Sequence, residues 1–422
     1  MIPHLISVEP SLFDELSIMW ITIAAFLVFF MHAGFTLLES GMTQSKNAVN
    51  IAMKNLMAIS VGTVVYWFIG YSLMFGETSN GVFRWSGFFS SLDSPESHLL
   101  FFQTMFAATC ATIVSGAIAG RTKYSVFGIF AVIMTGLIYP IAGGWEWGDN
   151  GWLNNKSIVP AEFIDFAGSS IVHAVGGWAA LVGAFMVGPR LGKYVKGKVE
   201  AIPGHNKTLA TLGVMALWFG WFGFNGGSQL AWGGDNTVGA TTVVLFTNLG
   251  AAAGAIGALI TTWLWYGKPD IVQTLNGALA GLVSITAGVG NLTAAGVFIA
   301  GLLGGVIVVF SIEFIEKKLR IDDAIGASSV HGVVGVWGTI VIGLWGVDGG
   351  KGIGLFNGGG LDQLVIQTIG TLAYSLWAVV LAFIFFYLLK KFMGLRVTKE
   401  EEIAGLDIAE HGIRAYPGKR NR

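Results

Sequence analysis

Long unbroken runs of apolar residues recur along the whole sequence and restrict its fold more than any other feature. A helix of about 20 such residues, rising about 1.5 Å per residue, spans the hydrocarbon core of a bilayer. The strands of a membrane barrel would show short alternation instead, so the long runs exclude a barrel. The 422 residues are 54% hydrophobic and only 12% charged, with a mean hydropathy of +0.68. These values lie outside those of an average soluble domain, and the sequence predicts an all-α integral membrane protein.

Apolar runs separated by charged or Gly/Pro/Asn-rich breaks predict eleven transmembrane helices. They are expected near residues 17–38, 51–75, 98–119, 123–143, 168–188, 208–229, 239–266, 275–289, 295–316, 329–347 and 362–391, the eighth being short and interrupted by glycine. The prediction divides the chain into an extracytoplasmic N-terminal segment (1–16), an eleven-span domain (17–391) and a cytoplasmic C-terminal tail (392–422). Residues 1–15 contain no Lys or Arg, unlike a cleaved signal peptide, so the first span is expected to stay.

The positive charges indicate how these spans are oriented. With the N-terminus outside, 21 of the 24 Lys and Arg residues fall in the inner loops, near the inner ends of the spans or in the tail, and only Arg84, Lys156 and Lys351 fall outside. Such an excess marks the cytoplasmic side. We therefore expect the N-terminus outside, the C-terminus inside and a multi-pass protein of the cytoplasmic (inner) membrane.

An odd number of spans with opposite ends suggests an inverted repeat of five plus five helices, with a pore between the two halves. The fifth and tenth spans support it, because Ser, Val and Gly stand three residues before, one before and four after a histidine in each. The two segments read Ser170-Ile-Val-His173-Ala-Val-Gly-Gly177 and Ser328-Ser-Val-His331-Gly-Val-Val-Gly335.

The two histidines are the first candidates for chemistry. An ionisable side chain at bilayer depth is costly, so it usually lines a cavity or pairs with another polar group. A single buried histidine is often only a packing residue, but two at matching places of a repeat favour a pore pair in which the rings share one proton. A metal site is a weaker alternative, because Cys and carboxylate partners at ligand spacing are missing nearby.

Five motifs, in the same order along essentially the whole chain, resemble those of the ammonium transporter (Amt/Mep/Rh) family, closest to its bacterial Amt branch. They are Ala33-Gly-Phe-Thr-Leu-Leu-Glu39 with Ser45-Lys-Asn-Ala-Val-Asn50, Asp165-Phe-Ala-Gly-Ser-Ser-Ile-Val-His173, Gly220-Trp-Phe-Gly-Phe-Asn-Gly-Gly-Ser228, Val330-His-Gly-Val333 and Gly405-Leu-Asp-Ile-Ala-Glu-His-Gly412. The resemblance implies ammonium transport across the cytoplasmic membrane by a homotrimer with one pore per subunit.

The same resemblance implies roles for individual residues. Phe106 and Phe224 match the stacked phenyl gate, Trp147 and Ser228 match the outer site that captures ammonium, and His173 and His331 match the twin pore histidines. An aromatic face attracts a cation, and a serine oxygen accepts a hydrogen bond that potassium could not donate. Asn225 belongs to the same recruitment pattern, and Asp165 is expected to cap a helix start and to support ammonium indirectly.

Two stretches depart from the family pattern. Before the fifth span the chain reads Gly144-Trp-Glu-Trp-Gly148, which adds the carboxylate of Glu146 near the mouth. The approach to the tenth span, Asp322-Asp-Ala-Ile-Gly-Ala-Ser-Ser329, keeps paired aspartates but lacks a proline and a later acidic residue. The inner exit is therefore less well matched than the entrance.

Residues 395–422 could form a solvated end on composition alone. The resemblance implies instead a collar that packs on the inner loops and meets a regulator of the PII class. We expect ammonium or ammonia as the substrate, methylammonium as its analogue, no cofactor, no metal and no nucleic-acid partner. No nucleotide-binding motif is found, so an ion gradient would supply the energy.

Three other functions remain open at this stage. An ammonium sensor of the same fold could signal through its cytoplasmic side, and a neutral gas channel of the Rh type is disfavoured by Trp147, Ser228 and Asn225. An intramembrane hydrolase is the weakest alternative, because no nucleophile or metal set accompanies the histidines. The chain is therefore expected not to be an enzyme.

Overall fold

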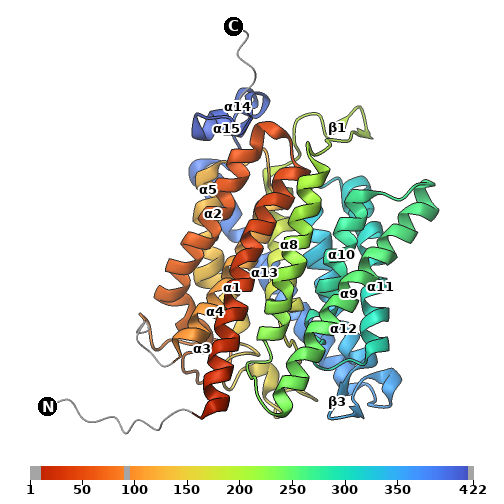
Figure 1. The fold of residues 1–422 in the computed structure, drawn as a ribbon. Coiled ribbons are helices and arrows are strands. Elements are labelled where there is room, and N and C mark those ends of the chain that lie inside the picture. The colour runs from red at the N-terminus through yellow and green to blue at the C-terminus, as the bar shows by residue number, and fades with distance from the viewer. Residues whose placement is uncertain (1–10, 90–95, 417–422) are drawn as a thin grey trace, which may run out of the picture.

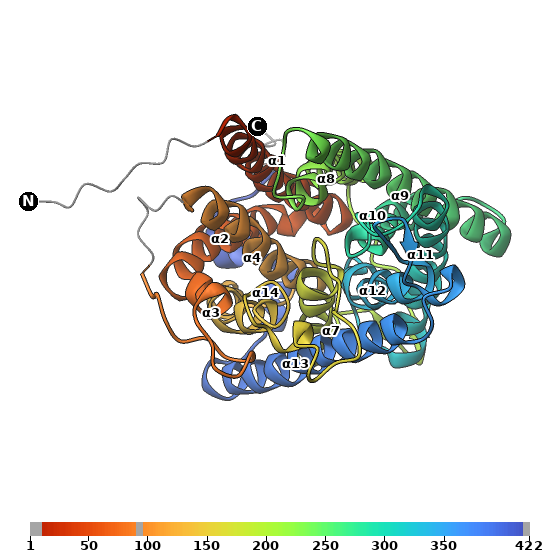
Figure 2. The same cartoon turned by 90° about the horizontal axis from the view of Figure 1, so that it is seen from below.

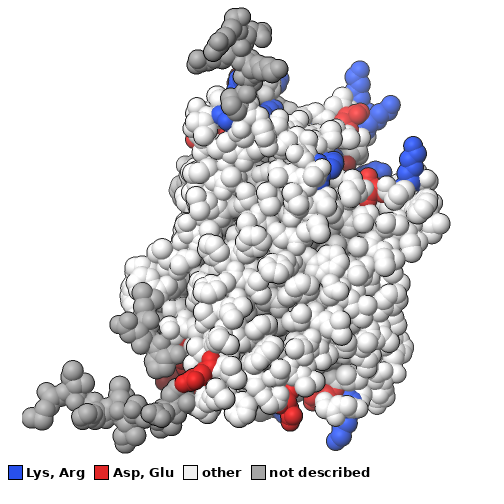
Figure 3. Space-filling model, in the orientation of Figure 1, with Lys and Arg blue, Asp and Glu red and all other residues white. Residues whose placement is uncertain are grey.

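The computed structural model describes residues 11–89 and 96–416 and forms one bundle of helices (Figure 1). Ten helices in these ranges are long and apolar enough to cross a membrane, and a shorter apolar helix, α10 (Ile271–Thr286), lies among them. Charged side chains gather at the two ends of the bundle, and a broad belt almost without charge separates them (Figure 3). The predicted all-helical membrane fold is confirmed, while the count of eleven spans stays a prediction.

The first half of the chain supplies five long helical segments, several of them built from consecutive helices. They are α1 (Leu12–Met42); η1 (Ser45–Asn47), α2 (Ala48–Val65), η2 (Tyr66–Gly70) and α3 (Tyr71–Phe75); α4 (Ser97–Ala117); α5 (Tyr124–Ile133), η3 (Met134–Ile138) and α6 (Tyr139–Gly143); and η5 (Ser169–Ala174) with α7 (Val175–Val187). A short turn, η4 (Trp152–Asn154), precedes the last of them. Helix α1 begins five residues before the predicted span, because Ser11 and Asp14 form a capping box that satisfies its first amides.

The second half follows the same order and ends in three further helices. It contains α8 (Lys207–Gly227), α9 (Asp235–Tyr266), α10, α11 (Ala294–Phe314) with η6 (Ile315–Leu319), η7 (Ser328–Val333) with α12 (Val334–Trp345), η8 (Leu355–Asn357), α13 (Asp362–Met393), α14 (Lys399–Ala404) and α15 (Leu406–His411). Two small hairpins, β1 (Tyr194–Val195) with β2 (Lys198–Val199) and β3 (Val347–Asp348) with β4 (Lys351–Gly352), lie in loops at opposite ends of the bundle (Figure 1).

Helix α10 is short because it lies inside the protein. Thirteen of its sixteen residues are buried, and it packs so closely on α9 that a Cβ at Gly281 would lie 2.2 Å from the carbonyl oxygen of Gly250. Small residues of this kind let membrane helices approach closely. A helix covered by its neighbours does not need the apolar length that contact with lipid requires, which explains the weak signal for this span.

Helices α7 and α12 lie near the middle of the bundle when it is seen from below (Figure 2). Each is preceded by a π-helix, η5 or η7, that carries one of the two predicted histidines. Their packing is reciprocal: a Cβ at Gly177 would lie 2.0 Å from the amide nitrogen of Gly332, and one at Gly335 would lie 2.9 Å from that of Ala174. Each glycine stands four residues after its own histidine and meets the residue after the other, as two elements related by a two-fold axis would. The packing supports the predicted inverted repeat.

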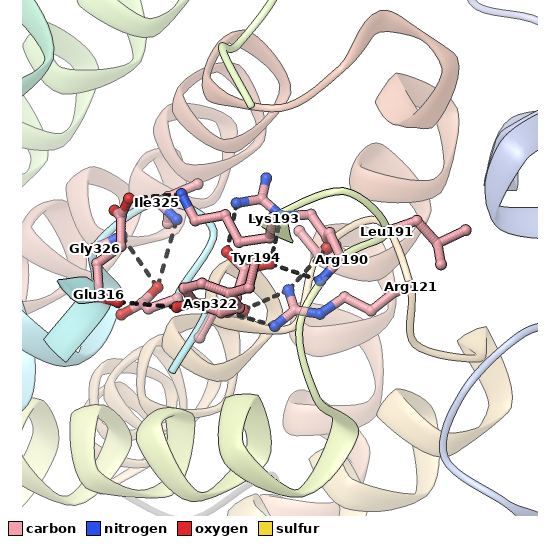
Figure 4. A network of polar contacts seen from close by, with 12 residues as sticks. Arg121, Arg190, Leu191, Lys193, Tyr194, Glu316, Asp322, Ile325 and Gly326 are labelled. Carbon is pink, nitrogen blue, oxygen red and sulfur yellow. Dashed lines mark hydrogen bonds and ion pairs between the residues drawn. The ribbon is translucent and has the colours of Figure 1, made fainter. Parts of the chain in front are cut away.

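Most of the Lys and Arg side chains visible in Figure 3 lie at the upper end of the bundle, which we call the basic end. The loops at this end are joined by a network of ion pairs (Figure 4). The guanidinium of Arg190 donates two bonds, of 2.8 and 2.7 Å, to the carboxylate of Asp322, and Arg121 donates to the backbone oxygen of Asp322. Burial acts to raise the pKa of Asp322, but the hydrogen bonds and charges of Arg190 and Arg121 hold that pKa well below its ordinary value. Since a lowered folded pKa means that stability is lost only as the pH falls through it, the pair stays charged under mild acid.

The tail packs on this end of the bundle rather than forming a solvated end. Lys46 donates 2.6 and 3.0 Å bonds to the backbone oxygens of Glu402 and Ile403, and the Asp407 carboxylate accepts from the amide of Asn50 at 3.0 Å. Helix α15 therefore packs on η1 and the start of α2, and α14 is held by Lys46 of η1, at the upper end of Figure 1.

Candidate functional site

The three aromatic residues predicted for the outer site and the gate are in contact. The rings of Phe106 on α4 and Phe224 on α8 are stacked, with centroids 4.0 Å apart and planes inclined by 25°. Trp147 meets Phe106 edge to face at 5.9 Å. Both phenyl rings are fully buried, so the stacked pair lies inside the bundle and out of contact with solvent.

Ser228, at the C-terminal end of α8, presents an oxygen acceptor one turn beyond Phe224. Its hydroxyl donates a 2.8 Å bond to the backbone oxygen of Phe224, which fixes the hydrogen and leaves lone pairs free to accept. Asn225 is buried and donates a 3.0 Å bond to Thr247, while its Oδ1 has no partner among the described residues. The C-terminal end of α8 thus carries two oxygen atoms that can accept a hydrogen bond, Ser228 Oγ and Asn225 Oδ1.

Asp165 holds the start of η5 and is joined to Trp147. One carboxylate oxygen accepts 2.9 and 2.7 Å bonds from the amides of residues 168 and 169, and the other accepts 2.8 and 2.9 Å bonds from those of 170 and 171. The indole nitrogen of Trp147 donates a 2.8 Å bond to the backbone oxygen of Asp165. The carboxylate therefore accepts from the free amides of a helix start, where negative charge is favoured. The bond from Trp147 joins the predicted capture residue to the backbone of the same aspartate.

Asp323 repeats this arrangement in the other half of the chain. Its carboxylate accepts from the amides of residues 325 to 328, at 3.4, 3.0, 3.1 and 2.6 Å. Asp165 and Asp323 each stand eight residues before their histidine and three before a glycine of positive φ, Gly168 or Gly326. The sequence reading recognised paired aspartates here but missed this equivalence, for which the shared spacing Asp-x-x-Gly was the available signal.

His173 and His331 meet at the centre of the bundle. Their Nδ1 atoms lie 3.1 Å apart and their rings are stacked at 5.1 Å with planes inclined by 24°. A bond between two such nitrogens holds one hydrogen, so one ring donates and the other accepts. The Nε2 atoms then differ as well, one being a donor and the other an acceptor.

The histidine pair continues the stack of phenyl rings. Phe224 lies 5.4 Å from His173 at 27°, so the order Phe106, Phe224, His173, His331 forms one line of rings. Trp221 flanks this line, stacked on His173 at 5.0 Å and 22°, and its indole donates a 2.9 Å bond to Thr286. The sequence reading did not single out Trp221, although it stands three residues before Phe224 and so shares its helix face.

Glu146, the residue that departs from the family pattern before the fifth span, lies beside Asp165. Its Oε1 accepts a long 3.4 Å bond from the amide of Asp165, and its Oε2 has no partner among the described residues. Burial first, and the nearby Asp165 second, raise the pKa of Glu146 well above its ordinary value. Within residues 11–89 and 96–416, no three His, Cys, Asp or Glu side chains are grouped to hold a metal ion.

Fold and site together define a helical membrane protein with a buried line of aromatic and imidazole rings between its two ends. The chain belongs to the Ammonium Transporter Family, whose sequence profile matches residues 19–416. It is 42% identical to ammonium transporter Amt2 of Archaeoglobus fulgidus, over 94% of this chain and 87% of the relative, and 40% identical to ammonium transporter Amt1 of Haloferax mediterranei, over 99% and 82%.

Solved structures agree with this membership. A structure titled "Sensor Amt Protein" superposes with a TM-score of 0.88 at 40% identity, covering 94% of this chain and 98% of that one. The crystal structure of Mep2 from Candida albicans superposes with a TM-score of 0.82 at 30% identity, covering 92% and 88%.

Proposed function

We propose that this protein transports ammonium across the cytoplasmic membrane, with its N-terminus outside and its C-terminus inside. Ammonium is captured at Trp147 and Ser228, and at the gate of Phe106 and Phe224 it transfers one proton to an acceptor nitrogen of the pair His173 and His331. Ammonia then passes inward by the histidines, and the proton leaves the pair to the inner side as well, so that net charge crosses the membrane. The observation that carries this proposal is the line of rings that ends in the Nδ1–Nδ1 contact of the histidines.

The chemistry of each step follows from its surroundings. An aromatic face attracts a cation by about 0.5–2 kcal/mol, and the Ser228 oxygen accepts a hydrogen bond that potassium cannot donate. Beyond the phenyl rings an ammonium ion would be desolvated at high cost, whereas a proton can be shared between two imidazoles. This difference favours transfer of the proton from ammonium to the histidine pair. The Nε2 atoms of the two imidazoles, one a donor and the other an acceptor, can both bind ammonia, which is neutral and polar.

We further propose that the protein is a homotrimer and that a PII-type regulator is its cytoplasmic partner. The docked C-terminal tail supports the proposal of a regulator. Lys46 and Asn50 hold the tail through hydrogen bonds that a partner protein could replace. Analytical ultracentrifugation of the purified protein tests the trimer.

The decisive experiment for transport is a current evoked by ammonium. Purified protein in liposomes should respond to an ammonium gradient and not to an equal potassium gradient. The two ions are of similar size, so a difference between them reports hydrogen-bond donation and not radius.

Ser228→Ala should weaken methylammonium binding by roughly 0.5–1.5 kcal/mol, or up to about 3 kcal/mol if the bond is charge-assisted. The reason is that the variant removes the Ser228 hydroxyl oxygen, which is free to accept because its own hydrogen is donated to the backbone oxygen of Phe224. Titration of the wild type and the variant with methylammonium measures the change. Ser375→Ala, which removes a similar helix hydroxyl bonded within α13, is the matched control. Equal affinities of Ser228→Ala and the wild type would mean that the site lies elsewhere.

An ammonium sensor is the second candidate, and the likeness to "Sensor Amt Protein" favours it specifically. A transport pore must release its guest, whereas a sensor needs only a binding energy that differs between two conformations. The docked tail is the element that such a difference would move.

The two functions predict opposite results for one preparation. Transport predicts an ammonium current or uptake in liposomes. If neither is found, while ammonium binds tightly and changes the protease accessibility of residues 395–416, the sensor function replaces transport.

A further inference from the structure

A small internal cavity lies on the basic-end side of the histidine pair. It is lined by His331, by Phe35 and Glu39 of α1, and by Ile325 of the loop before η7. Its volume of about 10 Å³ is about that needed for one water-sized molecule. The line of rings described above therefore does not end at His331 but opens onto a space that also contains a carboxylate.

The carboxylate of Glu39 is buried and only half satisfied. Its Oε2 accepts a 2.6 Å bond from Ser115 and a 3.3 Å bond from Asn55. Its Oε1 has no hydrogen-bond partner among the described residues, and the residue is 1% exposed. A buried acceptor without a partner is costly, and a hydrogen-bond donor that carries positive charge would satisfy this oxygen most strongly.

The protein itself supplies only a distant positive charge. The ammonium group of Lys54 is fully buried without a hydrogen-bond partner, and none of the ion pairs of the described residues joins it to Glu39. Lys54 can therefore offset the charge of Glu39 through space but cannot donate to Oε1. The free oxygen stays available to a small guest.

The ring of Phe35 completes the cavity. It lies 6.4 Å from the ring of His331 and supplies an aromatic wall of the kind that attracts a cation. Carboxylate oxygen, aromatic wall and room for one small molecule match a monovalent cation that donates hydrogen bonds.

We propose that Glu39, with Phe35, forms a second, inner binding site for ammonium, filled from the cytoplasmic side. The proposal rests on the proposed transport function, since occupancy of this site would oppose inward flow when internal ammonium is high. Lys54 keeps the binding weak enough for release, because it competes for the same negative charge.

The test is uptake of radiolabelled methylammonium into right-side-out membrane vesicles that contain the full-length protein and are loaded with increasing ammonium chloride. In the wild type, internal ammonium should inhibit uptake. In Glu39→Gln the internal concentration for half inhibition should rise about tenfold, as expected for the loss of one charge-assisted hydrogen bond. The external half-saturation concentration should stay within about twofold of the wild type, because the capture site is unchanged.

Glu162→Gln is the matched control, since it makes the same change at an exposed carboxylate that pairs with Lys156. Inhibition of Glu39→Gln at the wild-type internal concentration would overturn the inner site. If Glu39→Gln does not elute as folded protein, Ser115→Ala replaces it. This variant removes the bond that orients the carboxylate and should shift inhibition in the same direction by less, and an unchanged value would again overturn the proposal.

Absence of uptake in the wild type would overturn transport and not the inner site. The site is then tested by the Tm of purified protein in ammonium chloride against sodium chloride. Ser228→Ala should keep part of the ammonium-dependent stabilisation, and the double variant with Glu39→Gln should lose it. Equal stabilisation of the two variants would remove the inner site.

Discussion

Replacing either His173 or His331 with alanine is expected to abolish ammonium conduction or to change its ion selectivity, while the protein still folds. Each ring has the other as its hydrogen-bond partner at Nδ1, so removing one ring also frees the tautomer of the other. We expect the current to fall by at least about tenfold, the cost of losing about 1.4 kcal/mol in a barrier. Current and reversal potential in liposomes measure both effects.

His32→Ala is the control for this experiment. His32 is also buried in the bundle, and neither of its ring nitrogens has a hydrogen-bond partner among residues 11–89 and 96–416. The variant His32→Ala therefore causes the same loss of volume and polarity and leaves the pair His173 and His331 unchanged. Unchanged current and selectivity in the double variant His173→Ala/His331→Ala would remove the pore assignment.

The histidine pair also illustrates what one sequence can predict. Both residues sit in similar strings of Ser, Val and Gly, and the structure explains the glycines: Gly177 and Gly335 each meet the backbone of the other element. A pattern that reflects backbone contact is visible in sequence because only glycine fits. Hydrophobic runs are visible in the sequence for another physical reason, because contact with lipid sets their length.

Other features leave no such signal. Helix α10 is covered by protein, so neither length nor hydropathy marks it strongly. The free oxygen of Glu39 depends on which side chains of α2 and α4 reach it, and Asn55 and Ser115 are far from it in sequence. Contacts between distant segments decide such sites, and local composition does not record them.

The π-helices at the start of the fifth and tenth spans were also not predicted. Both η5 and η7 begin where an aspartate side chain binds amides that a regular helix start would leave free. The aspartates themselves were visible in the sequence, and one was expected to cap a helix. Their common geometry was visible only once both carboxylates were seen to accept four amides.

This geometry leads to the second prediction with a large effect. Asp165→Asn should lower the free energy of unfolding by about 3 kcal/mol or more, because charge-assisted bonds contribute about 1.5–3 kcal/mol each and the amide group can replace only one of the two accepting oxygens. The remaining NH₂ would face amide donors. Asp323→Asn should have a similar effect on stability, because its carboxylate also accepts from four consecutive amides, those two to five residues further on, where Asp165 accepts from those three to six residues on. Thermal unfolding of the purified protein, followed by the Tm, compares the two variants.

The two variants should differ in their affinity for methylammonium, although their stabilities should be similar. Asp165 accepts the indole hydrogen of Trp147 through its backbone oxygen, so a displaced η5 start also displaces the capture site, whereas Asp323 lies at the other end of the line of rings. We therefore expect methylammonium affinity to fall in Asp165→Asn and to stay near the wild-type value in folded Asp323→Asn. Asp362→Asn, an exposed aspartate in the first turn of α13, should cost only about 0.3–1 kcal/mol and controls for the loss of a helix-start charge. If Asp165→Asn behaves like Asp362→Asn in both stability and affinity, the carboxylate supports neither the helix start nor the capture of ammonium.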